Sequence, residues 1–134
     1  MKTNELRLGN YILIDCIMYK EERKVTEICP DGVFAKTKYT ANMPEIVFIK
    51  EEDIEPIELT EDVLVKIGFE GEMYEFCLHT EDANITVNLI ENRVEISFFG
   101  NCEAELCIKY NVKYLHELQN AYYCLTNQEM EVKL

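Results

Sequence analysis

The sequence predicts an α+β protein made of two parts. Residues 1–58 are expected to form a small bent β-sheet or SH3-like barrel, and residues 59–134 an α+β unit in which an antiparallel sheet is packed by a C-terminal amphipathic helix. Three observations support this: β-rich runs with turn residues between them over residues 11–50, a period-two apolar alternation over residues 73–110, and a helical period near the end. At 134 residues, one compact domain is the alternative organisation.

The first part is predicted from four short β-rich runs. The run 11–19 is followed by the charged stretch 20–23, which is predicted to be a polar turn. Pro30-Asp31-Gly32 is a strong turn signal, because proline presets φ and glycine accepts a positive φ. Return strands are expected over residues 33–39 and 46–49, and short strands with tight turns are typical of a small bent sheet or barrel.

A short helix is expected over residues 61–67. Thr60 is a suitable N-cap, and Glu61 and Asp62 in the first turn interact favourably with the helix dipole. Gly68 supplies the left-handed residue that ends the helix.

Antiparallel strands are expected over residues 73–110, each with one apolar face, followed by a helix over residues 112–126. Asn111 is predicted to cap the start of this helix and Asn127 to take the left-handed position at its end. The helix should lie across the apolar face of the sheet. A short closing strand is expected at residues 130–134.

Acidic residues are concentrated in one third of the chain. Of 26 acidic and 13 basic residues in all, residues 51–82 contain twelve acids and a single lysine, a net charge of −11. The interpretations are a solvated surface that maintains solubility, a docking surface for a basic protein, or, with less support, a cation site that lacks the usual loop spacing. The acids predicted to bind a partner are Glu51, Glu52, Asp53, Glu55, Glu58, Glu61 and Asp62.

No recognisable catalytic, cofactor or metal motif is present, so no catalytic residue, cofactor or metal ligand is assigned. Ser97 is the only serine, and the five glycines form no phosphate-binding loop. The six cysteines are expected to be reduced and structural. Cys77 and His79 should share the outer face of a strand, but the paired C-x2-C spacing of structural zinc sites is missing. Tyr114 and Tyr123 on the last helix either pack with their hydroxyls at the surface or contact a ligand or subunit.

The net charge of −11 over residues 51–82 indicates that this region does not bind nucleic acid directly, because binding to phosphates requires a basic surface. The chain has no apolar run long enough to span a membrane and no basic, apolar start typical of a secretory signal, so a cytoplasmic protein is expected. Its oligomeric state is not predicted.

Three segments resemble short proteins of Bacteroides-type bacteria and their phages or mobile elements. They are NELRLGNY at residues 4–11, IEPIELTEDVL at 54–64 with IGF at 67–69, and KYNVKYLHELQNAYYCLT at 109–126. No activity is established for that group, so no functional residue is carried over. The resemblance implies a small accessory protein.

The function expected is therefore non-catalytic binding, by an accessory protein that engages a basic host protein through its acidic middle. The first alternative is a binder or sponge for a small, nucleotide-like ligand, in a pocket between sheet and helix or between subunits. The second alternative is a small enzyme without a recognisable motif.

Overall fold

The computed structural model describes residues 1–16, 19–36, 45–80, 83–98 and 106–132. The fold class is α+β, as predicted, with two antiparallel sheets of five strands each. The chain divides into two compact units, Met1–Ile57 and Glu58–Leu134, and each unit is described by itself.

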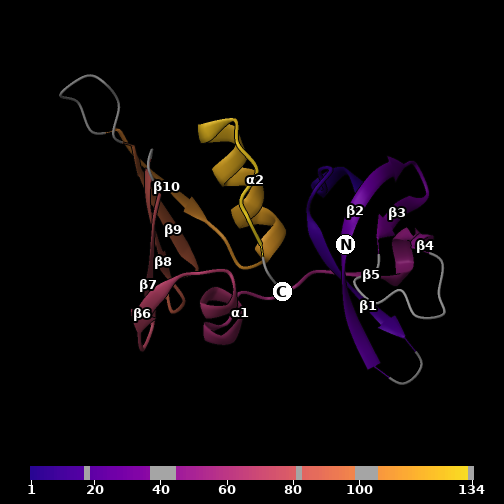
Figure 1. Cartoon of the computed structure of the whole chain (residues 1–134), viewed down its shortest axis with the longest axis horizontal. Coiled ribbons are helices and arrows are strands. Elements are labelled where there is room, and N and C mark those ends of the chain that lie inside the picture. Colours follow the sequence, from indigo (N-terminus) through magenta and orange to yellow (C-terminus); the bar gives the residue numbers. More distant parts are fainter. Residues whose placement is uncertain (17–18, 37–44, 81–82, 99–105, 133–134) are drawn as a thin grey trace. The chain divides into compact units, whose positions relative to one another are not determined.

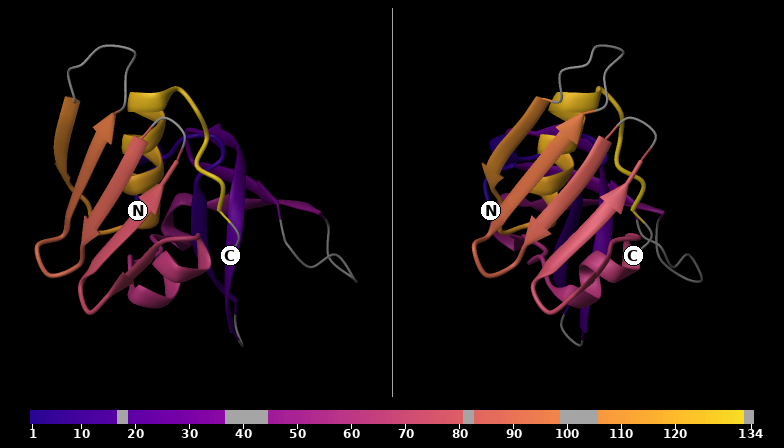
Figure 2. Two further views of the ribbon diagram at one scale, coloured as in Figure 1. Left: turned by 60° about the vertical axis from the view of Figure 1, so that its left-hand side comes forward. Right: turned by 90° about the vertical axis from the view of Figure 1, so that its left-hand side faces the viewer.

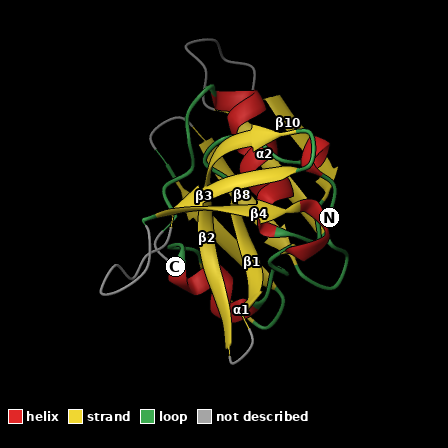
Figure 3. Cartoon of the chain, turned by 90° about the vertical axis from the view of Figure 1, so that its right-hand side faces the viewer, coloured by secondary structure: helices red, strands yellow, loops and turns green. Residues whose placement is uncertain are grey.

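The first unit consists of β-strands and two single-turn 3₁₀ helices (Figures 1 and 3). Its elements are η1 (Thr3–Glu5), β1 (Tyr11–Cys16), β2 (Tyr19–Cys29), β3 (Gly32–Lys36), β4 (Ile46–Lys50), η2 (Glu51–Asp53) and β5 (Ile54–Glu55). The strands pair in the order β4-β3-β2-β1-β5, all antiparallel. The turn predicted at Pro30 is confirmed, because Cys29 pairs directly with Gly32.

The link between β4 and β5 shows that this sheet is strongly bent. The two strands lie at opposite ends of the strand order, which would place them about 19 Å apart in a flat sheet. Only the three residues of η2 join them, and such a link spans at most about 14 Å. The predicted bend is confirmed. The closed SH3-like barrel is not, because β4 and β5 share no ladder within the described residues and the sheet remains open.

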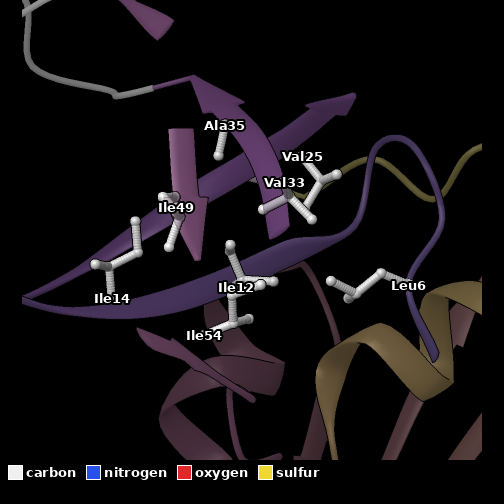
Figure 4. Close-up of a cluster of buried hydrophobic side chains, with 8 residues drawn as sticks. All are labelled: Leu6, Ile12, Ile14, Val25, Val33, Ala35, Ile49 and Ile54. Atoms are coloured by element: carbon white, nitrogen blue, oxygen red, sulfur yellow. The ribbon is translucent and has the colours of Figure 1, made fainter. Parts of the chain in front are cut away.

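The inner side of the bent sheet is filled by aliphatic side chains from every strand (Figure 4). This core contains Leu6, Ile12, Ile14, Val25, Val33, Ala35, Ile49 and Ile54. Gly32 lets β3 and β4 approach closely, since a Cβ at this position would lie 2.1 Å from the carbonyl oxygen of Ile49. Burial of these apolar groups is the main stabilising term for the unit.

The polar turn predicted at residues 20–23 is wrong, because the whole stretch lies inside β2. Glu21 and Arg23 alternate with exposed or half-buried neighbours and are themselves buried, at 7% and 4% exposure. Arg23 Nη2 lies 2.9 Å from Glu21 Oε2, so each charge is compensated by the other. Glu21 and Arg23 are the alternate residues of β2 that face inward. Polarity alone indicates a turn at such charged residues, and this is why the prediction failed.

The second unit is a five-stranded antiparallel sheet between two helices in the sequence. Its elements are α1 (Glu61–Lys66), β6 (Glu70–Glu72), β7 (Glu75–His79), β8 (Ala83–Asn88), β9 (Arg93–Phe98), β10 (Leu106–Asn111) and α2 (Leu115–Thr126). The order is β10-β9-β8-β7-β6, so each strand pairs with its neighbour in the sequence. Both helices lie on one face of this sheet (Figures 1 and 2). The predicted arrangement of sheet and C-terminal helix is confirmed.

Helix α1 has the ends that the sequence predicts. Thr60 Oγ1 accepts a hydrogen bond from the backbone N–H of Val63 at 3.3 Å, and Gly68 has a φ of +96°. The helical residues end at Lys66, with Ile67 as the C-cap, one residue earlier than expected.

Helix α2 begins at Leu115 and not at residue 112, and Asn111 is not its cap. Asn111 stays in β10, paired with Arg93. The carboxylate of Glu117 accepts hydrogen bonds from the backbone N–H groups of Lys113 and Tyr114 at 2.7 and 3.0 Å, and these bonds define the start. The predicted end is confirmed, since Asn127 has a φ of +55°.

The segment after α2 contains no strand within residues 128–132. Met130 and Val132 are nevertheless buried, so this segment contributes apolar side chains without joining the sheet. Leu134, predicted to belong to the same strand, lies outside the described residues.

Candidate functional site

The seven predicted acids are distributed over both units. Glu51, Glu52 and Asp53 form η2, and Glu55 lies in β5, all in the first unit. Glu58, Glu61 and Asp62 belong to the second unit, the last two in the first turn of α1. The acids therefore form two groups, one in each compact unit.

Three of the seven acids are neutralised locally by lysines. Glu52 lies 3.7 Å from Lys50, Glu58 lies 3.4 Å from Lys113, and Glu55 forms an ion pair with Lys20. The hydrogen bond to Glu58 raises the pKa of Lys113, because it favours the charged ammonium. Exposed pairs of this kind add little stability, but they reduce the charge available to a partner.

The second unit carries five exposed carboxylates that form no ion pair within the described residues. They follow one another from α1 through β6 to the start of β7, and the only base between them is Lys66. These five residues, termed the acidic surface, are Glu61, Asp62, Glu70, Glu72 and Glu75. The first two belong to α1, on the helix-covered side of the sheet, and the other three lie on β6 and β7. Two members of the acidic surface were predicted, whereas the three on β6 and β7 were not among the seven, although they lie in the same acidic third of the sequence.

Pairing across the sheet places the carboxylates of β6 and β7 on its outer face. Glu70 stands opposite Cys77, and Glu72 stands opposite Glu75, while the alternate residue Phe76 is fully buried on the other face. Glu72 and Glu75 thus lie side by side as like charges, which is unfavourable without a cation between them.

The hairpins of this sheet expose large apolar side chains that sequence reasoning missed. Met73 is 81% exposed, Ile90 71% and Tyr74 41%. These three residues are termed the turn patch. The sequence did contain one signal for this patch, the pair Met73-Tyr74 between Glu72 and Glu75. A two-residue hairpin connection normally contains asparagine, aspartate or glycine, so large apolar residues there are unusual.

The two tyrosines proposed as ligand or subunit contacts do not form one site. Tyr114 is the half-buried N-cap of α2, stacked on His116 with 5.9 Å between the ring centroids. Tyr123 is half-buried further along α2, about 13 Å away at the helical rise per residue. Its neighbour Tyr122 is buried at 6% exposure and faces the core.

A pocket of about 370 Å³ lies in the second unit. The end of α1, the end of β7, α2 and residues 129–131 surround it. Apolar groups of Ile67, Leu78 and Tyr122 line it together with the charged side chains of Lys66 and Glu129. The arrangement suits a small molecule with one apolar and one charged end.

The first unit has a pocket of about 310 Å³ at the buried ion pair. It is lined by Ile14, Arg23, Val47, Phe48, Ile49 and Asp53. The Nη1 atom of Arg23 is buried and has no hydrogen-bond partner among the described residues. Because Glu21 already compensates the guanidinium charge, this pocket offers no net positive site for an anion.

Cys77 and His79 point to the outer face of β7, as expected, and both have hydrogen-bond partners on β8. Cys77 Sγ lies 3.5 Å from Thr86 Oγ1, and His79 Nδ1 lies 2.6 Å from Asn84 Oδ1. Within the part of the chain that the structure describes, no three His, Cys, Asp or Glu side chains are grouped to hold a metal ion.

No family model, curated protein or solved structure matches the chain. Among the described residues, no helix has both the length and the apolar character needed to cross a membrane.

Proposed function

We propose that the chain is a non-catalytic binding protein whose second unit engages a basic protein partner. The observation that carries this proposal is the acidic surface, whose five exposed carboxylates form no ion pair in the described structure. Carboxylates elsewhere on the same unit do have cations, as Glu95 has Lys109 at 3.2 Å and Glu91 has Arg93 at 2.6 Å. A basic partner would supply the missing cations.

The same proposal places the protein in the cytoplasm, as an accessory protein of a phage or mobile element of Bacteroides-type bacteria. The resembling segments at residues 4–11, 54–64 with 67–69, and 109–126 support this context. The net charge of −11 over residues 51–82 favours a protein partner over a nucleic acid.

A lysine-rich peptide serves as the probe for this proposal, with binding followed by fluorescence anisotropy. We expect its affinity for the protein to fall by about tenfold or more as salt rises from about 50 to 500 mM, because exposed charges are screened. Converting all five carboxylates of the acidic surface to amides should weaken binding by at least about tenfold at low salt.

The matched control changes the same number of charges on the first unit, at Glu22, Glu27, Asp31, Glu45 and Glu52. If binding depends on position and not merely on net charge, the control keeps most of its affinity. Equal losses in the two variants, or binding that salt does not weaken, would contradict the proposal.

A second candidate function is binding of a small ligand in the 370 Å³ pocket of the second unit. Its apolar lining and its rim of Lys66, Glu129 and Glu131 favour an aromatic amine over a nucleotide, because two carboxylates repel phosphate.

For this second candidate, phenethylamine at millimolar concentration should raise the Tm by about 2 °C or more, since a ligand that binds only the folded state stabilises it. Adenosine monophosphate should give no shift. The variant with Glu129→Gln and Glu131→Gln should lose the response to the amine. No shift with either compound, or a shift with the nucleotide alone, would eliminate this candidate in its present form.

A further inference from the structure

Two hairpin turns of the second unit lie side by side at one end of its sheet. Met73 and Tyr74 connect β6 to β7, and Leu89–Asn92 connect β8 to β9. The backbone N–H of Leu89 donates to the carbonyl oxygen of Tyr74 at 2.8 Å, which joins the turns directly. Both turns are visible at the same end of the sheet in Figure 2.

The side chains of the turn patch are not needed to form these turns. In the β8–β9 turn, Asn88 Oδ1 accepts hydrogen bonds from the N–H groups of Ile90 and Glu91 at 3.1 and 3.0 Å, and Asn92 takes the positive φ. The side chain of Ile90 is 71% exposed and contributes little to that geometry. Turn positions normally contain polar residues or glycine, so exposed Met73 and Ile90 side chains on two turns joined by a hydrogen bond are unusual.

The charge beside the turn patch decides what can cover it. Glu72 and Glu75 flank the Met73-Tyr74 connection, and Glu70 lies further along β6, all exposed. A second copy of this chain would bring the same carboxylates face to face, which costs free energy. A basic segment would bring cations to them and is therefore the favoured occupant.

We propose that the turn patch binds a large apolar side chain of the basic partner, while Glu72 and Glu75, which lie side by side, bind lysine or arginine residues next to it. This inference rests on the proposed function and identifies the part of the second unit that confers specificity. The partner segment is thus basic with an apolar anchor, and not merely positively charged. Methionine suits such a contact because its flexible thioether adapts to different apolar shapes.

The test compares two peptides of equal charge, one rich in lysine with several leucines and one in which the leucines are alanines. We expect the wild-type chain to bind the leucine peptide about tenfold more tightly, in line with burial of an apolar anchor at a small interface. The double variant with Met73→Asn and Ile90→Ser should bind both peptides with the affinity that the wild type has for the alanine peptide. Asparagine accepts the φ of +60° at position 73, so the fold should be retained.

The matched control is Val65→Ser, which removes an apolar side chain that is 55% exposed on α1 of the same unit. It should keep the preference for the leucine peptide. The wild type could bind the two peptides equally, while the variant with all five carboxylates of the acidic surface converted to amides binds both more weakly. That result would overturn the inference and leave the proposed function standing.

Two further outcomes also overturn it. Binding of neither peptide would overturn the proposed function, and the inference with it. A wild-type dimer that the double variant dissociates, measured by light scattering, would show that a second copy occupies the turn patch in place of a basic partner.

Discussion

Replacing Arg23 with alanine is expected to lower the free energy of unfolding of the first unit by about 3–5 kcal/mol. The guanidinium is 4% exposed and bonds Glu21 Oε2 through Nε and Nη2, at 3.3 and 2.9 Å. Its removal takes this guanidinium away from the buried Glu21 carboxylate, so the desolvation of that charge is compensated less well. Urea denaturation followed by circular dichroism, together with amide hydrogen exchange of β1 and β2, measures the loss.

Two further variants separate the charge from the volume of Arg23. Lys24→Ala, on the exposed side of the same strand, should change stability by no more than about 0.5 kcal/mol. The double variant with Glu21→Leu and Arg23→Leu should recover most of the stability, because an apolar pair in such a site is often as stable as the ion pair. A double variant as unstable as Arg23→Ala alone would show that lost packing, and not the lost ion pair, causes the destabilisation.

Replacing Phe76 with alanine is expected to destabilise the second unit by about 3–5 kcal/mol. Phe76 is fully buried on β7 and lies between Gly71 of β6 and Val87 of β8 in the sheet. A Cβ at Gly71 would lie 2.7 Å from the Phe76 Cα, so the backbones are already close. Loss of the ring would therefore leave a cavity that these strands cannot easily close.

Thermal or urea unfolding, with hydrogen exchange of the β7 and β8 amides, measures this effect. Glu75→Ala on the opposite face of the same strand is the control and should be nearly neutral, since that side chain is exposed. Phe76→Leu should cost much less than Phe76→Ala because it retains most of the apolar volume. Equal stability of the alanine variants at positions 75 and 76 would contradict the assignment of Phe76 to the core.

Local signals predicted the parts of the fold that depend on neighbouring residues. Thr60 caps the start of α1 as expected, and Gly68 and Asn127 follow the ends of α1 and α2. These positions are predictable because caps and left-handed residues act through the adjacent backbone. The predicted start of α2 was wrong because two features determine that start together. One is the carboxylate of Glu117 inside the helix, and the other is the pairing of Asn111 in β10.

Parts that depend on distant residues were not predicted. The strand through Glu21 and Arg23 requires burial of two charges that satisfy each other, and polarity alone indicates the opposite. The two-residue strand β5 is defined only by its pairing with Leu13 and Ile14 in β1. Patterns along the chain contain no information about such partners.

The same distinction applies to the candidate site. The excess of acidic residues in residues 51–82 was visible in the sequence. The sequence did not show which of these carboxylates have lysines beside them. The turn patch was also hidden, because the two turns that contain Met73 and Ile90 are brought together only through the strand register and the bond between Leu89 and Tyr74.

The two strand orders imply different routes by which each sheet can assemble. In the second unit every strand pairs with the strand before it, so the sheet can extend stepwise as the chain leaves the ribosome. In the first unit, β1 must await Ile54 and Glu55 before its free edge is covered, and the amino group of Met1 hydrogen-bonds the carbonyl of Ile54 at 3.2 Å. Closing such distant contacts costs chain entropy before they stabilise anything, so a nascent first unit stays incomplete until β5 has emerged.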